Sequence, residues 1–179
     1  MGAWMPPGFR SSFAPFNDQQ AELLLLHMTG KPFSIATVAG WADMDANAHM
    51  GNFAYLNKCV DARMSFFSQH GFPVTEFAKR RIGPVLRRDE VEYHREIGLF
   101  EPITVTLEIA GMAPDGSRYR LVNRILKADG ALAARVRCEG GWMDLVGRKL
   151  IAPPEDLLAA LSAMPSAAEF ESLPSSVRK

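Results

Sequence analysis

The stretch WADMDANAHMGNFAYLNKCVDARMSFF, residues 41–67, joins a polar loop to an apolar helix and decides the fold. From about residue 51 to residue 70, apolar side chains recur at helical spacing, at Phe53, Leu56, Val60, Met64 and Phe67. Gly71 is a natural stop for such a helix, which would be about 30 Å long. Further apolar residues widen the surface beyond one stripe, namely Ala54, Cys59, Ala62 and Phe66. We therefore expect other elements to wrap this helix.

Antiparallel strands are the elements that the rest of the chain predicts. The sequence ITVTLEIAG alternates, with Ile103, Val105, Leu107 and Ile109 on an apolar face and Thr104, Thr106 and Glu108 on a polar face. Pro114-Asp115-Gly116 and Asp129-Gly130 are turn signals, so the strands that flank them should pair as hairpins. Residues 32–41 and 85–97 predict two more strands, and no second long helix is expected between residues 84 and 145.

Both ends of the chain extend beyond this pattern. Asn17 and Gln20 resemble a capping box before AELLLLHM, which predicts a short helix that Gly30 closes. A final helix, EDLLAALSAM, follows Pro153-Pro154 and precedes a tail rich in Pro, Ser and Glu. We expect an N-terminal arm over residues 1–30, one domain over residues 31–160 and a tail over residues 161–179.

Composition excludes several classes of function. A chain of 179 residues fits one core, and its Lys plus Arg and Asp plus Glu balance at 20 each. No net field therefore attracts nucleic acid or an anionic membrane, and the apolar run 23–26 is far too short to cross a bilayer. Cys59 and Cys138 have no C-x-x-C spacing, so we expect reduced thiols and a cytoplasmic protein.

The polar loop before the helix needs a chemical explanation. Asp43, Asp45 and Asn47 begin like a calcium loop, but Ala48 and Ala54 stand where the Gly and the bidentate Glu should be. The histidines form no H-x-x-x-H pair, and the sequence has no phosphate loop and no nucleophile elbow. We expect neither a metal nor a cofactor. The alternative that Asp43, Asp45, Asn47 and Asn52 only cap a helix and form Asx turns stays open.

A family resemblance favours chemistry over capping. The run D-M-D-A-N-A-H-M-G-N-F-A-Y-L, followed by Asp61 and Arg63, resembles the D-x-D-x-x-G-H-V-N-N-x-x-Y signature of the 4-hydroxybenzoyl-CoA thioesterase family. The strand GGWMDL, residues 140–145, is similar to that family's last strand, and the resemblance covers about residues 33–158. It implies an α+β hotdog fold, a long central helix wrapped by an antiparallel sheet. Ala48 departs from the usual Gly, and Gly51 from the first Asn.

The resemblance also implies an activity and a site. The protein would be an acyl-CoA thioesterase, with Asp45 as nucleophile on the thioester carbonyl or as general base for water. Asn52 would donate a backbone N–H to the developing oxyanion, which the first turn of a helix stabilises. His49 could bond the carbonyl or the sulfur, or simply be satisfied beside the helix. Coenzyme A would be part of the substrate, with no separate cofactor.

Other roles implied for the site concern binding and assembly. The resemblance assigns Tyr55 and Asp61 to the substrate-binding region, where they would orient the loop or the partner subunit, although packing on the helix also explains Tyr55. Arg87 and Arg88, or residues 79–81, could clamp the phosphates of coenzyme A. Hotdog proteins of this kind place the site between protomers, so we expect a homodimer or homotetramer. A hydratase or dehydratase, a non-catalytic acyl-thioester binder and a purely structural dimer remain alternatives, and the acyl group is not specified.

Overall fold

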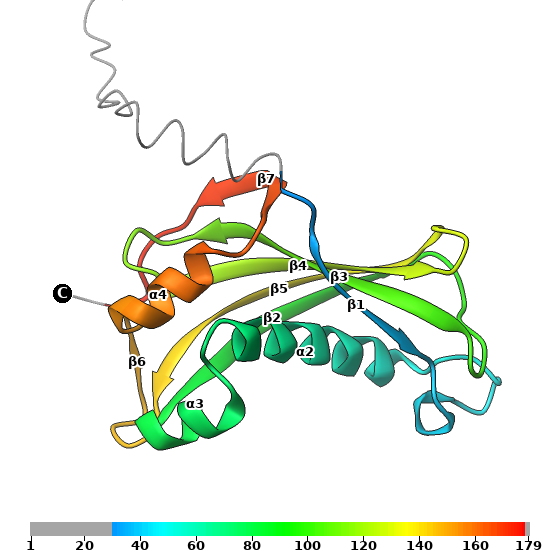
Figure 1. Ribbon diagram of the computed structural model, residues 1–179, viewed down its shortest axis with the longest axis horizontal. Helices are drawn as coiled ribbons and strands as arrows, with labels where there is room; N and C mark the ends of the chain where they lie inside the picture. The colour runs from blue at the N-terminus through cyan, green and yellow to red at the C-terminus, as the bar shows by residue number, and fades with distance from the viewer. Residues whose placement is uncertain (1–29, 178–179) are drawn as a thin grey trace, which may run out of the picture.

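The predicted long helix is the central element of the structure, a computed structural model that describes residues 30–177. Helix α2 (Asn52–Gln69) lies across one face of a seven-stranded sheet (Figure 1). Two shorter helices, α3 (Val74–Arg80) and α4 (Glu155–Ser162), lie toward the end of the sheet where α2 ends. The helix expected at residues 17–30 lies outside the part of the chain that the structure describes.

The sheet is antiparallel except for one pair of strands. Its strands are β1 (Phe33–Val38), β2 (Ile82–Tyr93), β3 (Pro102–Met112), β4 (Arg118–Lys127), β5 (Leu132–Asp144), β6 (Lys149–Ile151) and β7 (Ser166–Ser172). The main order is β1-β3-β4-β5-β2, with β6 on β5 and β7 parallel to β3. Both predicted hairpins are present, since β3 pairs with β4 and β4 with β5. Strand β2 therefore forms one edge of this order.

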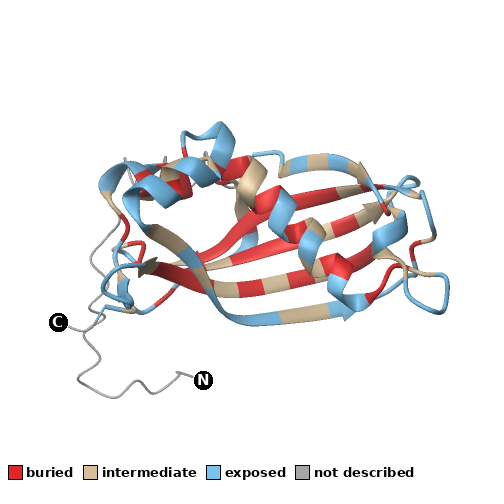
Figure 2. Cartoon of the chain, turned by 90° about the horizontal axis from the view of Figure 1, so that it is seen from below, coloured by how far each residue is buried: buried red, intermediate tan, exposed pale blue. Residues whose placement is uncertain are grey.

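The core fills the space between α2 and the sheet (Figure 2). One cluster contains Phe66, Phe67 and Trp142, whose rings meet edge to face. A second cluster, with Met50 and Ile97, lies under the polar loop that precedes α2. Burying each large apolar side chain stabilises the fold by about 1.5–3 kcal/mol. The second cluster thus fixes the start of α2 against the sheet.

The predicted orientation of α2 is wrong in part. Phe53 and Val60, expected in the core, are 49% and 42% exposed. The buried side of the helix instead carries Ala54, Cys59 and Ala62, each fully buried. Small side chains let a helix approach a sheet closely, so the sheet packs on this side and leaves the larger side chains at the margin.

The polar face of β3 is also more enclosed than its pattern predicts. Thr106 and Glu108 are both only 8% exposed. Strand β7, which lies within the segment expected as a tail, covers part of this face, where Ala167 packs on Ala110 and Val122. No helix among residues 30–177 is long and apolar enough to span a membrane.

Candidate active site

The polar loop before α2 is a tight turn built around Asp45. Its Oδ1 accepts hydrogen bonds from the backbone N–H of Asn47 at 2.7 Å and of His49 at 3.4 Å. The Asp45 N–H donates to the His49 carbonyl at 2.8 Å, which closes the turn. Ala48 has a φ of 63°, the left-handed region that glycine adopts more readily. The carboxylate is therefore held in place by the backbone of its own loop.

A second loop, residues 94–101, braces the Asp45 turn. His49 and Gly98 form a β-bridge, and the Met50 N–H donates to the Ile97 carbonyl at 2.8 Å. Lys127 in turn holds the bracing loop, since its Nζ lies 2.7 Å from the Glu96 carbonyl oxygen and 2.9 Å from a Glu101 carboxylate oxygen. The position of Asp45 thus depends on residues about 50 positions further along the chain.

Helix α2 begins beside this turn without a side-chain cap. Its N-cap is Gly51, and Asn52 is its first residue. The side-chain oxygen of Asn52 accepts a hydrogen bond from the N–H of the following residue, Phe53, at 2.9 Å. The Asn52 backbone N–H occupies the first helical position, where no intrahelical acceptor exists. A substrate carbonyl could bind there.

The alternative of helix caps and Asx turns describes part of this loop, because Asp45 Oδ1 accepts the N–H of Asn47 two residues on, which is an Asx turn. Asp43 binds the Gly40 N–H at 2.7 Å and pairs with Lys58 Nζ at 2.7 Å, so it has the structural role of tying the loop to α2. Asp45 and Asn47 engage their own turn and do not cap α2. Asp45 is nevertheless exposed in the single chain, so its carboxylate is open to solvent.

The predicted catalytic residues share one open cavity of about 410 Å³. It is lined by Asp45, His49, Met50, Asn52, Tyr55, Tyr93, His94, Arg95 and Glu96. The last four end β2 or follow it, and the sequence did not indicate them as site residues because residues 85–97 have the pattern of one strand. The pairing of His94 and Arg95 N–H groups with the Ala133 carbonyl marks where the strand turns away.

Two contacts define the polar wall of this cavity. The Nε2 of His49 lies 3.1 Å from Oε2 of Glu96, which fixes the ring beside the Asp45 turn. Tyr55 is 4% exposed and meets Tyr93 edge to face, with ring centroids 5.0 Å apart. Burial, followed by the neighbouring Tyr93 and Asp45, raises the pKa of Tyr55. Its hydroxyl is therefore protonated at neutral pH and can donate a hydrogen bond.

Three predicted substrate-binding residues lie elsewhere on this chain. Asp61 lines a separate hollow on the outer side of α2 with Met64 and Ser65. Arg87 pairs with Glu139 at 2.9 Å and Arg88 with Glu90. Arg88 lines a cavity separate from that of Asp45, so Arg95 is the arginine that the fold places beside Asp45. The roles assigned to Asp61, Arg87 and Arg88 remain predictions.

The basic run 79–81 is also engaged at some distance from this cavity. Arg80 pairs with Glu76 at 2.6 Å and with Asp156 at 2.7 Å, which ties α3 to α4. Within residues 30–177, no group of three or more His, Cys, Asp or Glu side chains could hold a metal ion.

Comparison with known proteins identifies the family that has this arrangement. A model of the thioesterase-like superfamily matches residues 39–161, which includes the Asp45 turn, α2 and five strands of the sheet. The chain belongs to the thioesterase-like superfamily. This membership confirms the predicted family at the superfamily level and, with it, the predicted enzyme class. No curated protein sequence matches the chain significantly.

Solved structures similar to this thioesterase show its fold. A hypothetical protein of Staphylococcus aureus in complex with CoA is 24% identical, with a TM-score of 0.68 over 75% of this chain and 84% of that one. A 1,4-dihydroxy-2-naphthoyl-CoA thioesterase of Synechocystis is 18% identical, with a TM-score of 0.67 over 74% and 97%. A DHNA-CoA thioesterase of S. aureus is 20% identical, with a TM-score of 0.66 over 72% and 87%. The α+β hotdog fold is confirmed.

Proposed function

We propose that this thioesterase hydrolyses acyl-CoA esters to a carboxylic acid and free coenzyme A, with Asp45 as the catalytic carboxylate. The observation that carries the proposal is the position of Asp45 in an open cavity, beside a helix start that no side chain caps. The binding of CoA by the similar S. aureus protein supports a substrate of this type.

The geometry supports a reaction in which Asp45 activates water. Because Oδ1 accepts both N–H groups of the turn, Oδ2 is the oxygen directed to this task. The water oxygen attacks the thioester carbon while its proton passes to Asp45, and the carbonyl electrons move to oxygen. Collapse of this intermediate breaks the C–S bond, and the sulfur takes the proton back from Asp45. The nucleophilic route, through an anhydride with Asp45, uses the same placement.

The start of α2 would stabilise the oxyanion in either route. The Asn52 N–H and the positive end of the helix dipole favour negative charge at this point. One such donor is worth about 10²–10³ in rate, and a positioned base about 10²–10⁴. His49, fixed by Glu96, and the Tyr55 hydroxyl would complete the polar wall around the carbonyl or the sulfur.

The quaternary structure belongs to the same proposal. Strand β2 is twelve residues long and forms the sheet edge, with most of its side chains exposed or half-buried. An open edge of this length favours pairing with a second copy, because its backbone N–H and C=O groups need partners. We propose at least a homodimer through β2, in the cytoplasm, where the free thiols of Cys59 and Cys138 would stay reduced.

The second candidate is an acyl-thioester binder without turnover. Ala48 favours it, since an alanine at a φ of 63° departs from the glycine of the signature in the catalytic turn. A panel of short, long, branched and aromatic acyl-CoA esters separates the two functions when thiol release and binding are measured on the same samples. Turnover of at least one ester supports hydrolysis. Saturable binding with no thiol released by any ester would replace the hydrolase with the binder.

A further inference from the structure

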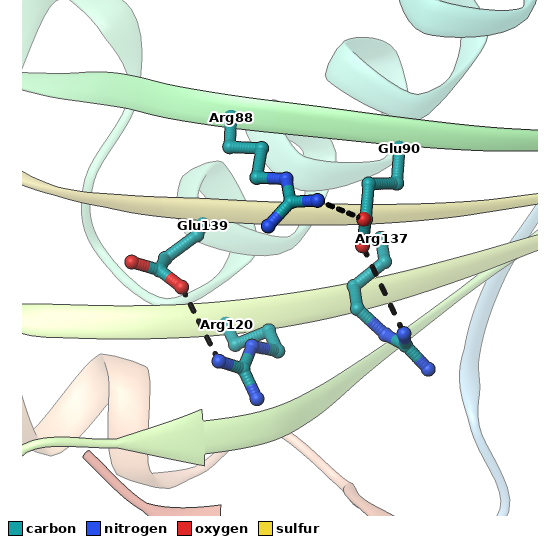
Figure 3. Close-up of a pocket in the computed structure, with 5 residues that line it drawn as sticks. All are labelled: Arg88, Glu90, Arg120, Arg137 and Glu139. Atoms are coloured by element: carbon teal, nitrogen blue, oxygen red, sulfur yellow. Dashed lines mark hydrogen bonds and ion pairs between the residues drawn. The ribbon is translucent and has the colours of Figure 1, made fainter.

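A second cavity lies on the face of the sheet opposite α2 and is lined only by charged side chains. These are Arg88, Glu90, Arg120, Arg137 and Glu139, which β2, β4 and β5 contribute (Figure 3). Its volume is about 180 Å³, smaller than the roughly 300–1,000 Å³ of sites for whole organic ligands. A site of this size suits a single small ionic group.

Strand register brings the three arginines together. Arg88 on β2 and Arg120 on β4 are both cross-strand partners of Glu139 on β5, so they flank it on either side. Adjacent strands are about 4.8 Å apart, which places the two arginine backbones about 10 Å from each other. Arg137 projects two residues along β5 on the same face, opposite Glu90. Three guanidinium groups can therefore reach one point above β5.

Arginines outnumber the carboxylates around this point. Glu139 alone is shared by Arg120 at 3.2 Å, Arg87 at 2.9 Å and Arg118 at 3.7 Å. Glu90 is shared by Arg88 and Arg137, the latter at 3.8 Å. Arg120 also pairs with Glu171, so five arginines meet three glutamates. Each guanidinium has five N–H donors, so arginines that share three carboxylates keep several N–H groups for another acceptor.

The rest of the same face shows what its arginines bind. Glutamates of β7 lie over this part of the sheet, where Glu171 pairs with Arg120 and Glu169 pairs with Arg124 and Arg135. Toward β2 the face is more open, and the side chain of Arg88 is 67% exposed. Arg124 and Arg135 thus have Glu169 of β7 as a partner, whereas toward β2 the arginines share Glu90 and Glu139 and are open to an anion from solution.

We propose that this cavity binds a phosphate group, with Arg88, Arg120 and Arg137 as its donors. A planar guanidinium matches phosphate oxygens with two parallel N–H bonds, which a lysine cannot provide. The site is separate from the Asp45 cavity of the same chain and does not depend on the proposed hydrolysis. The group could come from free inorganic phosphate or from a phosphate ester such as coenzyme A.

Titration calorimetry on the full chain tests the site, with inorganic phosphate as the probe and sodium chloride at matched ionic strength as the blank. The wild type should bind phosphate saturably, and Arg137→Gln should weaken binding about tenfold or more, because it removes charged hydrogen bonds. Arg137→Lys keeps the charge and should recover only part of the affinity. Arg124→Gln is the matched control, since Arg124 lies on the same face outside the cavity, and it should bind like wild type.

Two outcomes would overturn the site. One is the absence of saturable binding by both phosphate and coenzyme A, with heats no larger than those of chloride. The other is an equal loss in Arg124→Gln and Arg137→Gln, which would mean a diffuse field and no defined pocket. Circular dichroism confirms that each variant is folded. A titration of Asp45→Asn and Arg137→Gln with coenzyme A identifies the source of the phosphate group. If only Arg137→Gln loses coenzyme A binding, the nucleotide supplies the phosphate that this cavity binds.

Discussion

Replacing Asn123 by Leu should destabilise the protein strongly, because it isolates a charge inside the core. Arg63 is 6% exposed, and its Nε and Nη2 both donate to Asn123 Oδ1, at 3.1 and 2.9 Å. Asn123 is fully buried, and its Nδ2 donates to the Thr106 carbonyl at 2.8 Å. The chain Arg63, Asn123, Thr106 thus joins α2 to β4 and β3 at the centre of the fold.

The expected cost follows from these contacts. Hydrogen bonds to a charged group contribute about 1.5–3 kcal/mol each, and removal of one partner of a buried charged pair costs about 3–5 kcal/mol. Asn123→Leu loses both bonds from Arg63 and leaves the Thr106 carbonyl unpaired. We expect a loss of about 3–5 kcal/mol in the free energy of unfolding, or roughly 6–20 °C in Tm for a chain of this size.

Urea unfolding followed by tryptophan fluorescence measures this loss, since Trp142 is fully buried. The double variant Arg63→Met/Asn123→Leu removes the charge as well, so it should be more stable than Asn123→Leu alone. Asn57→Leu, at an exposed position of the same helix, is the control and should change stability by less than about 0.5 kcal/mol. A cost below about 1 kcal/mol for Asn123→Leu, or a double variant as unstable as the summed costs of Arg63→Met and Asn123→Leu, would show that Asn123 does not stabilise the buried Arg63 charge.

Three further predictions concern Ala48, Gly141 and Glu101. Ala48→Gly should raise Tm slightly, because it relieves about 1–2 kcal/mol of left-handed backbone strain at φ 63°, and a lower Tm would contradict this. Gly141→Ala should lower Tm by several degrees, since the added Cβ would lie 2.5 Å from the Ser117 carbonyl oxygen. Gly98→Ala is the control and should leave Tm unchanged, because the atom nearest to its added Cβ, Oε2 of Glu101, is 3.9 Å away. The hydrogen bond from the Gly98 N–H, followed by the one from Lys127, lowers the pKa of Glu101 in the folded protein. The ionised Glu101 carboxylate therefore stabilises the fold at pH values above its unfolded pKa. This stabilisation is lost as the pH falls through the folded pKa. Urea unfolding should therefore show Glu101→Gln less stable than wild type at pH 7, with the gap narrowing in acid, and a constant gap would contradict the assignment.

The sequence predicted the elements whose pattern is local. The 3.6-residue spacing before Gly71 located α2, the alternation from Ile103 to Ile109 located β3, and Asp129-Gly130 located a hairpin. The signature around Asp45 also indicated Asp45, His49, Asn52 and Tyr55 as site residues, and all four line one cavity. In each case a short segment contains the physical information, either as a period or as a turn.

Features that depend on distant segments were missed or misplaced. The burial of Ala54 in place of Phe53 follows from how closely the sheet approaches α2, which no helical period encodes. Strand β7 pairs in parallel with β3 from more than fifty residues away, and its polar sequence resembles a tail. Arg95 and Glu96 reach the site only because the loop after β2 pairs with the Asp45 turn.

The most direct test of the proposed chemistry is the rate of thiol release by Asp45→Asn with the best acyl-CoA ester of the panel. Asp129→Asn is the matched control, because Asp129 is also an exposed turn residue whose Oδ1 accepts the N–H two residues on, at 2.9 Å. We predict that Asp45→Asn loses about 10²–10⁴ in kcat with an unchanged fold, while Asp129→Asn keeps the wild-type rate. An Asp45→Asn variant that releases thiol as fast as wild type would show that Asp45 is not the catalytic carboxylate.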